Sequence, residues 1–503
     1  MDEQSGVRRE RRRRRGARST VARLLHDHPR GARATAAVTV LVLLGGGAFA
    51  AGAVTGPSAP STGVAATASV SPTPPTPSRS ATPISSPTPT PAPTETPTTA
   101  APTATPVRTC SVAAAAADPR LARFEGAVLD AASGDVLFDR DGSTPARTGS
   151  VLKTLTSAVA LSVLGPDHRL STRVTGDAGG GAIALVGGGD ATLSAAAGPS
   201  VYAGAPKLSD LAAQVRSGLG DASVTRITLD ATYWDQADEW DPSWKRTEQT
   251  IGYHSEVTAL MVDGDRADPT AQTSPRSTDP VARAGEAFRA ALVDAGVVGA
   301  ETAVMAQGTA TGTVVLGEVR SQPVSTLISQ LLPTSDNTLA EMLARVSSRV
   351  SGADGSSASL TPLYRSVLAS AYGLDTSSTT IVDGSGLSEN DAVPATVVAD
   401  LMVAVADRRG GLGVVYDALP ISGRTGTLAA RFTGENAVAA GAVHAKTGWI
   451  DTAYTLAGSI DAADGTRLAF AFYAIGDVRD DARAALDTLT AAVYRCGGDL
   501  SGE

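Results

Sequence analysis

One lysine of this sequence follows a serine at a spacing that permits nucleophilic catalysis. In the segment Ser150-Val151-Leu152-Lys153, serine and lysine are three residues apart and share one face if the segment is helical. A serine hydroxyl is a poor nucleophile until a neighbouring group accepts its proton. Lysine can accept that proton when its surroundings lower its pKa, whereas arginine stays charged. The segment therefore predicts Ser150 as a nucleophile and Lys153 as its general base.

Two further motifs complete a set that is more specific than any one of its members. Ser-Asp-Asn at 335–337 precedes a helical pattern, and taken alone it would be interpreted as a capping turn. Lys-Thr-Gly at 446–448 precedes an apolar segment. Arg-Thr-Gly at 424–426 resembles it but carries arginine and lies in a glycine-rich turn. The whole chain has only four lysines (Lys153, Lys207, Lys245 and Lys446), so two of the four fall within these motifs.

The order Ser-x-x-Lys, Ser-x-Asn, Lys-Thr-Gly is the motif set of penicillin-binding proteins and class A β-lactamases. More specifically, the chain resembles the D-alanyl-D-alanine carboxypeptidases of the penicillin-binding protein 4 type (peptidase family S13). The matching segments are SVLKTLTSAVAL (150–161), LVGGGDATL (185–193), LPTSDNTLAEML (332–343), DGSGLS (383–388), LPISGRTGTLAARF (419–432) and AKTGWIDTAYTLAGSI (445–460). The 184 residues between Ser150 and Ser335 agree with the inserted domains of that family rather than with a compact β-lactamase.

The resemblance implies a serine acyl-transfer mechanism on peptidoglycan stem peptides, with β-lactams as covalent inhibitors and with no metal or organic cofactor. The implied roles are nucleophile for Ser150, general base for Lys153, proton relay for Ser335, orientation of the substrate amide for Asn337, binding of the terminal carboxylate for Lys446 and Thr447, and an oxyanion hole from the backbone amides of Ser150 and Trp449. The family usually has Thr or Ser where Trp449 stands, so a side-chain contact to the substrate carboxylate would be lost. The alternatives are a β-lactamase and a catalytically silent, stalked wall-binding protein.

Strands and helices that would position these residues can be expected along the chain. Strands are predicted at 124–130, 135–139, 226–229, 453–460 and 467–475, and helices at 150–164, 284–295, 340–350 and 480–494. Strands, then helices, then strands joined as hairpins predict an α+β fold with an antiparallel sheet covered by helices. The resemblance implies that the fold is a β-lactamase/penicillin-binding-protein-like transpeptidase fold with an inserted α/β region. The expected catalytic domain comprises residues 110–170 and 311–498, and the insert comprises 171–310.

The N-terminal part of the chain differs in composition from the rest. Residues 1–33 carry eleven arginines and four acidic residues, and the apolar, uncharged segment 34–54 is long enough to cross a membrane. We favour a membrane anchor over a cleaved signal peptide, with a cytoplasmic leader before it. Residues 55–109 are rich in Pro, Ser and Thr and should form a disordered stalk. The whole chain of 503 residues has a net charge of −9, although residues 1–33 are basic, so the remaining chain is acidic. This charge balance argues against a nucleic-acid binder.

Both cysteines of the sequence flank the part that is expected to fold. Cys110 and Cys496 are too few for a cysteine-based zinc site or a disulfide-rich scaffold. In an exported protein a disulfide between them would join the two ends of the folded part. The alternative is a pair of unrelated thiols.

Overall fold

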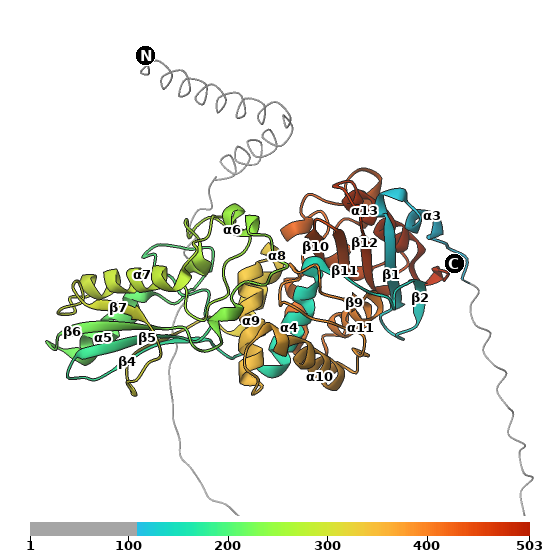
Figure 1. Ribbon diagram of the computed structural model, residues 1–503. Coiled ribbons are helices and arrows are strands. Elements are labelled where there is room, and N and C mark those ends of the chain that lie inside the picture. The colour runs from blue at the N-terminus through green and yellow to red at the C-terminus, as the bar shows by residue number, and fades with distance from the viewer. Residues whose placement is uncertain (1–107, 503) are drawn as a thin grey trace, which may run out of the picture. The chain divides into compact units, whose positions relative to one another are not determined.

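The computed structural model describes residues 108–502 (Figure 1). The predicted leader, the apolar segment 34–54 and nearly all of the predicted stalk lie outside these residues. Within residues 108–502, no helix combines the length and the apolar character that crossing a membrane requires. A membrane anchor therefore stays a prediction.

One sheet brings the two ends of the described chain together. Its strands are β1 (Arg123–Asp130), β2 (Val136–Arg140), β10 (Val443–Ile450), β11 (Ala453–Asp461) and β12 (Arg467–Ile475). They are arranged in the order β10-β11-β12-β1-β2, and every neighbouring pair is antiparallel. The predicted antiparallel sheet is thus confirmed, and the strand that carries Lys-Thr-Gly is at its edge.

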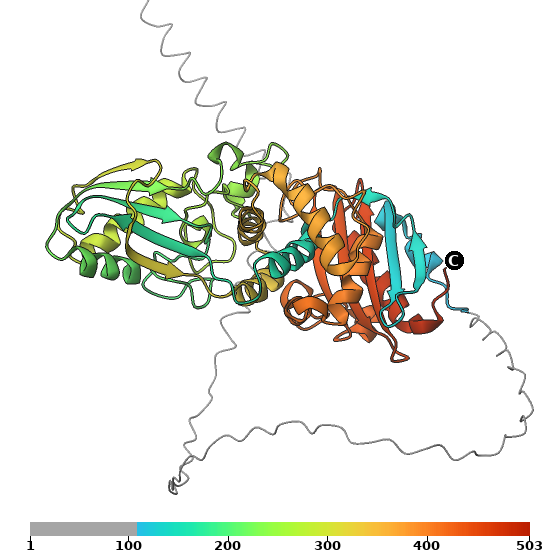
Figure 2. The ribbon, with the colours of Figure 1, turned by 90° about the horizontal axis from the view of Figure 1, so that it is seen from below.

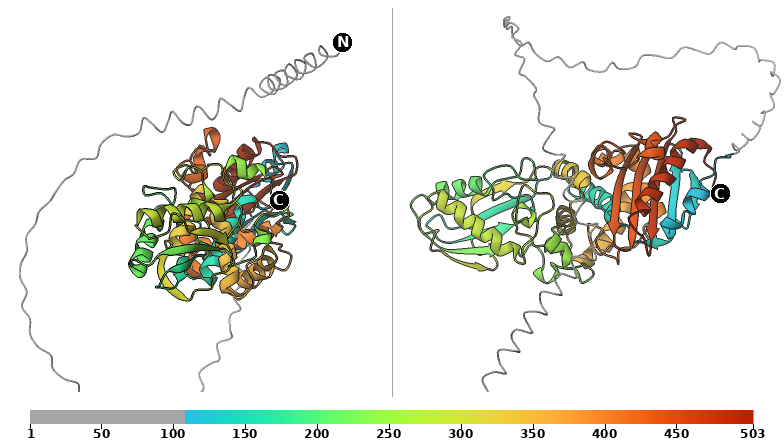
Figure 3. Two further views of the ribbon diagram at one scale, coloured as in Figure 1. Left: turned by 60° about the vertical axis from the view of Figure 1, so that its left-hand side comes forward. Right: turned by 90° about the horizontal axis from the view of Figure 1, so that it is seen from above.

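Alternation along the strands divides the apolar side chains between two cores. In β12, Ala469, Ala471 and Tyr473 belong to one buried cluster, whereas Phe470 and Phe472 belong to another. Helices α4 (Leu152–Val163), α8 (Val324–Thr334), α9 (Asn337–Val350), α10 (Leu360–Tyr372), α11 (Ala395–Ala406) and α12 (Gly413–Ala418) contribute to the first cluster, and α13 (Ala482–Cys496) contributes to the second. The sheet therefore has helices on both faces, as Figures 2 and 3 show.

A second sheet lies beside this helical layer (Figures 1 and 2). Its strands are β4 (Ser171–Gly176), β5 (Gly181–Gly187), β6 (Val224–Asp230), β7 (Val304–Gln307) and β8 (Val314–Arg320), in the order β7-β6-β5-β4-β8. The β5–β6 and β6–β7 pairs are parallel, whereas the other two pairs are antiparallel. Helices α5 (Leu208–Leu219) and α7 (Pro280–Asp294) pack their apolar sides against this sheet.

The second sheet has the α/β character that was expected of the insert. It begins at the expected residue, but β8 extends it to Arg320, ten residues past the expected limit at 310, because β8 pairs with β4. We refer below to residues 171–320 as the second lobe. The division into a catalytic domain and an inserted domain stays a prediction.

Short elements connect the larger ones. They include α3 (Ala113–Ala116), α6 (Thr247–Ile251), and the strand pair β3 (Pro145–Ala146) with β9 (Val393–Pro394). A disulfide joins Cys110 to Cys496 with a Cα–Cα distance of 5.4 Å, which is the pairing expected from the sequence.

Candidate active site

Ser150 lies in a tight turn that leads into a buried helix. A single 3₁₀ turn, Gly149–Val151, precedes α4, and Lys153 is in the first turn of that helix. The Nζ atom of Lys153 is 2.8 Å from Ser150 Oγ. The Thr455 hydroxyl on β11 donates to the carbonyl of Thr148, which ties the turn to the sheet. Local helical geometry therefore places the lysine next to the serine, and a tertiary contact holds the pair in place.

Lys153 is fully buried and is surrounded by oxygen atoms. Its Nζ donates to Asn337 Oδ1 at 2.6 Å and to the carbonyl oxygen of Ser385 at 2.6 Å, in addition to Ser150. No ion pair among residues 108–502 includes Lys153. Burial lowers the pKa of Lys153 to about 8, although nearby buried carboxylates such as Asp383 oppose this shift. A substantial fraction of this lysine is therefore neutral near pH 8 and able to accept a proton.

Ser335 and Asn337 lie where two helices meet. Ser335 ends α8 in the left-handed conformation, with a φ of 57°. Asp336 caps α9 by accepting a hydrogen bond from the Leu339 amide at 3.0 Å. The capping interpretation of this motif is thus correct for Asp336. The same turn directs Asn337 to Lys153 and Ser335 to Lys446, which donates to Ser335 Oγ at 2.9 Å.

Lys446 is a fully buried residue of β10 and lies behind Ser335. Its Nζ also donates to the carbonyl of Thr447 at 2.7 Å. Burial lowers the pKa of Lys446 well below its ordinary value, and the positive charge of Lys153 lowers it further. An anion arriving beside this lysine would restore its charge. Next to it, the Thr447 hydroxyl donates to that of Thr427 at 2.8 Å.

A cavity of about 850 Å³ opens onto these groups. Its lining includes Ser150, Ser335, Asn337, Thr427, Thr447 and Trp449, whereas Lys153 and Lys446 are not part of the lining. Among these lining residues, Ser150 and Asn337 are hydrogen-bonded to buried Lys153, and Ser335 is hydrogen-bonded to buried Lys446. The Trp449 ring is half exposed at the wall of the cavity. It is the side chain that replaces the smaller hydroxyl residue expected from the family.

The backbone amide of Trp449 faces the turn Gly149–Val151, which carries Ser150. On β10 the Ala445 amide donates away from β11, to the Pro420 carbonyl at 2.9 Å. Because amides alternate along an antiparallel strand, the amide of Trp449 points to that same open side. A Cβ built on Gly149 would be 3.0 Å from the nitrogen of Trp449, so the turn and the strand edge are in close contact. The amides of Ser150 and Trp449 are thereby placed near one another.

The Asp-Gly-Ser-Gly turn at 383–386 contributes a backbone carbonyl rather than a side chain. Asp383 accepts hydrogen bonds from the Ser385 amide at 2.9 Å and from the Trp244 indole at 2.8 Å. Gly386 has a positive φ, and a Cβ there would be only 1.9 Å from the carbonyl oxygen of Gly149. The close approach requires glycine and brings the Ser385 carbonyl to Lys153. The sequence gives no signal for this contact, because Ser385 and Lys153 are 232 residues apart.

Thr427 also lies in the cavity wall, although none of the three sequence motifs includes it. It directly follows the Arg-Thr-Gly segment at 424–426, which carries arginine where the Lys-Thr-Gly motif carries lysine. The structure nevertheless places its hydroxyl on Thr447, in the cavity wall. A hydroxyl-rich turn gives no sequence signal for this contact, because Thr427 and Thr447 belong to different elements.

Comparison with known proteins identifies relatives over most of the described chain. The family model described as "D-Ala-D-Ala carboxypeptidase 3 (S13) family" matches residues 109–275 and 266–493. A protein named "Carboxypeptidase DacB" from Mycolicibacterium smegmatis is 35% identical over 397 residues, which cover 77% of this chain and 84% of that protein. A "D-alanyl-D-alanine carboxypeptidase" from Actinomadura sp. is 29% identical over 442 residues, covering 70% and 78% of the two chains.

A solved structure shares the fold at low sequence identity. It is penicillin binding protein 4 from Haemophilus influenzae, with a TM-score of 0.62 and 18% identity, and the match covers 74% of this chain and 95% of that chain. At this identity the likeness is evidence for the fold alone. It confirms the α+β fold that was predicted from the sequence.

Proposed function

Because the chain belongs to the D-Ala-D-Ala carboxypeptidase 3 (S13) family, and is a serine-type D-Ala-D-Ala carboxypeptidase, we propose that it removes the terminal D-alanine of peptidoglycan stem peptides through an acyl-enzyme on Ser150. The observation that carries this proposal is the 2.8 Å contact between Lys153 Nζ and Ser150 Oγ at the cavity wall. A neutral, buried lysine at that distance can take the proton of the serine as its oxygen attacks.

In the acylation step, Ser150 Oγ forms an ester bond to the carbonyl carbon of the penultimate D-alanine. Lys153 accepts the hydroxyl proton, and the amides of Ser150 and Trp449 stabilise the negative charge that develops on the carbonyl oxygen. The peptide C–N bond then breaks. The leaving amine receives a proton through Ser335, whose hydroxyl is hydrogen-bonded to Lys446. Water hydrolyses the ester in the second half of the reaction and regenerates Ser150.

Substrate orientation is assigned to the polar groups around the cavity. Asn337 is hydrogen-bonded to Lys153 and would also orient the substrate amide. The terminal carboxylate would contact the hydroxyls of Thr447 and Thr427, with the charge of Lys446 behind them. Thr427 is thus added to Lys446 and Thr447, the two residues expected to bind the carboxylate. Because Lys446 is buried, it would act on the carboxylate largely through its electrostatic field. Trp449 would supply only its backbone amide and an apolar wall.

A wall substrate and covalent inhibition by β-lactams define the biological setting that we propose. Stem peptides lie outside the cytoplasm, so the catalytic domain would be extracytoplasmic, on a stalk formed by residues 55–109 and anchored by residues 34–54. A β-lactam presents a strained carbonyl and a carboxylate, and it would acylate Ser150 as the peptide does. The name of the Haemophilus influenzae protein with the same fold is consistent with this proposal.

Labelling with a fluorescent penicillin tests the proposal. Wild-type protein should form a covalent adduct, and Ser150→Ala should form none. Ser162→Ala, which alters an exposed serine of the same helix, is the matched control and should label like wild type. An adduct that persists in Ser150→Ala, or no adduct on wild type, contradicts the mechanism. Release of D-alanine from a pentapeptide, compared with hydrolysis of the penicillin, then separates the peptidase from the alternative β-lactamase.

A further inference from the structure

A buried polar cluster connects the second lobe to the Ser-Asp-Asn turn of the active site. Its members are Arg266 and Tyr202, which belong to the second lobe, and Asp336, which lies between the two site residues of that turn. All three are buried, with exposed fractions of 1%, 4% and 5% respectively. The proposed mechanism assigns no role to any of them.

The three side chains form a closed set of hydrogen bonds. Arg266 donates to Asp336 Oδ2 at 2.7 Å, and the Tyr202 hydroxyl donates to the same oxygen at 2.9 Å. Arg266 also donates to the Tyr202 hydroxyl at 2.8 Å. The other carboxylate oxygen, Oδ1, accepts the Leu339 amide at 3.0 Å. Both oxygens of Asp336 are thus occupied, one by its own helix and one by the second lobe.

Charge complementarity maintains this arrangement. Burial alone would raise the pKa of Asp336, but the guanidinium groups of Arg266 and Arg276 hold it below its ordinary value. The carboxylate is therefore ionised at any pH at which the enzyme is expected to work. A buried ion pair of this kind adds little net stability, but removal of one partner leaves the other charge buried without compensation.

The backbone that carries Arg266 adopts an unusual conformation. Asp263, Gly264 and Asp265, which directly precede it, have φ values of 53°, 57° and 60°. Left-handed conformation at two non-glycine residues is unfavourable and persists only where the surroundings hold it. Hydrogen bonds from the second lobe do so here.

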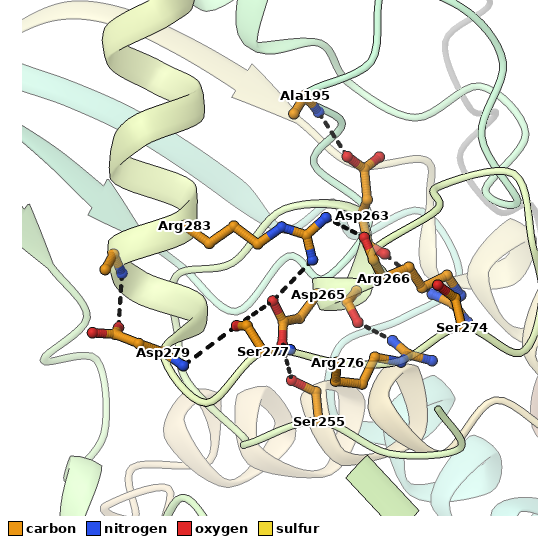
Figure 4. A network of polar contacts seen from close by, with 12 residues as sticks. Ala195, Ser255, Asp263, Asp265, Arg266, Ser274, Arg276, Ser277, Asp279 and Arg283 are labelled. Atoms are coloured by element: carbon orange, nitrogen blue, oxygen red, sulfur yellow. Dashed lines mark hydrogen bonds and ion pairs between the residues drawn. The ribbon is translucent and has the colours of Figure 1, made fainter. Parts of the chain in front are cut away.

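Figure 4 shows the network that holds this turn. The Asp265 carboxylate accepts hydrogen bonds from Ser255 at 3.1 Å and from the Ser277 hydroxyl at 2.8 Å, and it pairs with Arg283 at 3.1 Å. Asp263 accepts the amide of Ala195 at 3.0 Å. A strained turn that is fixed by so many contacts gives Arg266 a single position from which to meet Asp336.

We propose that Arg266 and Tyr202 are positioning residues for acylation: by holding Asp336, they keep Ser335 on Lys446 and Asn337 on Lys153. The physical reason is covalent continuity, because Ser335 and Asn337 are the immediate neighbours of Asp336 and Ser335 is itself in a left-handed conformation. This inference rests on the proposed function, and it gives the second lobe a part in the chemistry.

The expected effect is on the acylation step rather than on binding. If Asp336 is released, Ser335 Oγ and Asn337 Oδ1 lose their fixed positions, and a displacement of about 1 Å near a reacting centre can lower a rate by about a hundredfold. The cavity wall remains, so the initial non-covalent affinity should change little. Rapid mixing with a chromogenic β-lactam separates the first-order acylation rate constant from the dissociation constant of the initial complex.

Three variants and one matched control make the test. Tyr202→Phe removes a single oxygen and should slow acylation about threefold to tenfold, and Arg266→Gln should slow it tenfold or more. Arg266→Lys keeps the charge and should be intermediate. The control is Arg345→Gln. Arg345 lies on α9, is 1% exposed and pairs with Asp238 of the second lobe. In the described part of the chain, no hydrogen bond or ion pair joins Arg345 to Asp336.

Each result decides for or against the inference. The inference is supported if acylation is slow in the Tyr202 and Arg266 variants and near normal in Arg345→Gln. The melting temperature of Arg345→Gln should be comparable to that of the other variants. Acylation within twofold of wild type in Tyr202→Phe and Arg266→Gln overturns the inference, and so does an equal loss in Arg345→Gln. If Arg266→Gln does not fold, Tyr202→Phe decides. Failure of wild type to be acylated would instead contradict the proposed function.

Discussion

At the scale of single residues, two buried lysines acquire different properties from their neighbours. Lys153 is surrounded by three oxygen acceptors and lies near buried carboxylates that favour its charged form. Lys446 contacts one hydroxyl and one carbonyl, and the charge of Lys153 disfavours its protonation. Arginine could not replace Lys153 as the base, because a guanidinium cannot be discharged to accept a proton. The use of lysine at position 153 thus follows from the chemistry that we propose for it.

The pKa of Lys153 predicts the pH dependence of acylation. Its pKa is lowered to about 8, and the neutral form is the base, so acylation by a β-lactam should rise with pH and level off above about 8. Lys153→Arg should be slower by about a hundredfold or more at every pH. The measurement is the second-order acylation rate constant between about pH 6 and pH 9.5. Lys207→Arg is the control and should keep the wild-type profile; a flat wild-type profile would argue against a neutral-lysine base.

At the scale of elements, helix α9 joins the site to its buried acidic surroundings. It begins at Asn337 and carries Glu341 one turn later, where the carboxylate accepts the Gly384 amide at 2.8 Å. Burial, together with the charge of Asp383, raises the pKa of Glu341. The protonated form is thus favoured in the folded protein. A single helix therefore supplies a site residue at its start and a neutral acid behind the Asp-Gly-Ser-Gly turn.

This raised pKa predicts a loss of stability at alkaline pH. The folded state holds a proton on Glu341 that the unfolded chain releases near pH 4.5. The contribution of this proton to the free energy of unfolding is therefore present at low pH and is lost as pH rises through the pKa of Glu341 in the folded state. Glu341→Gln mimics the protonated acid. It should melt like wild type at about pH 5 and at a higher temperature than wild type at about pH 9. Scanning calorimetry at both pH values checks this, with Glu318→Gln, a partly exposed acid, as control; identical pH dependence of wild type and Glu341→Gln would contradict it.

At the scale of the whole molecule, the described chain is closed at its two ends. The Cys110–Cys496 disulfide is accompanied by hydrogen bonds from the Cys110 amide to the Asp499 carbonyl at 3.1 Å and from the Ser501 amide to the Cys110 carbonyl at 2.9 Å. Gly502 lies beside β2 at one edge of the first sheet, whereas Ser150 lies beside β10 at the other edge. The closure should therefore affect stability without affecting the chemistry.

Removal of the disulfide tests this separation. The double variant Cys110→Ser/Cys496→Ser should lose about 2–5 kcal/mol of unfolding free energy and keep its acylation rate, because the disulfide restricts the unfolded chain. Guanidinium unfolding and penicillin labelling measure the two effects. Alkylation of the wild-type protein without reductant should leave its mass unchanged. Labelling of both thiols, or a loss of acylation in the folded double variant, would be inconsistent with this account.

The sequence by itself was sufficient for the groups that act through local geometry. Ser150 and Lys153 share one helical turn, so their spacing predicted their contact. The strands expected at 453–460 and 467–475 are adjacent in sequence, and they pair as the antiparallel strands β11 and β12. Three motifs in a fixed order indicated the family, and the comparisons confirmed it.

Only the tertiary structure decided which distant groups support those motifs. Arg266 and Tyr202 meet Asp336 across 70 and 134 residues of chain, and the Ser385 carbonyl meets Lys153 across 232. Such contacts leave no periodic pattern, because each depends on how separate elements pack rather than on residue spacing. The sequence therefore determined which side chains could react, whereas packing determined their burial and the groups that hold them, and with these the pKa values on which the reaction depends.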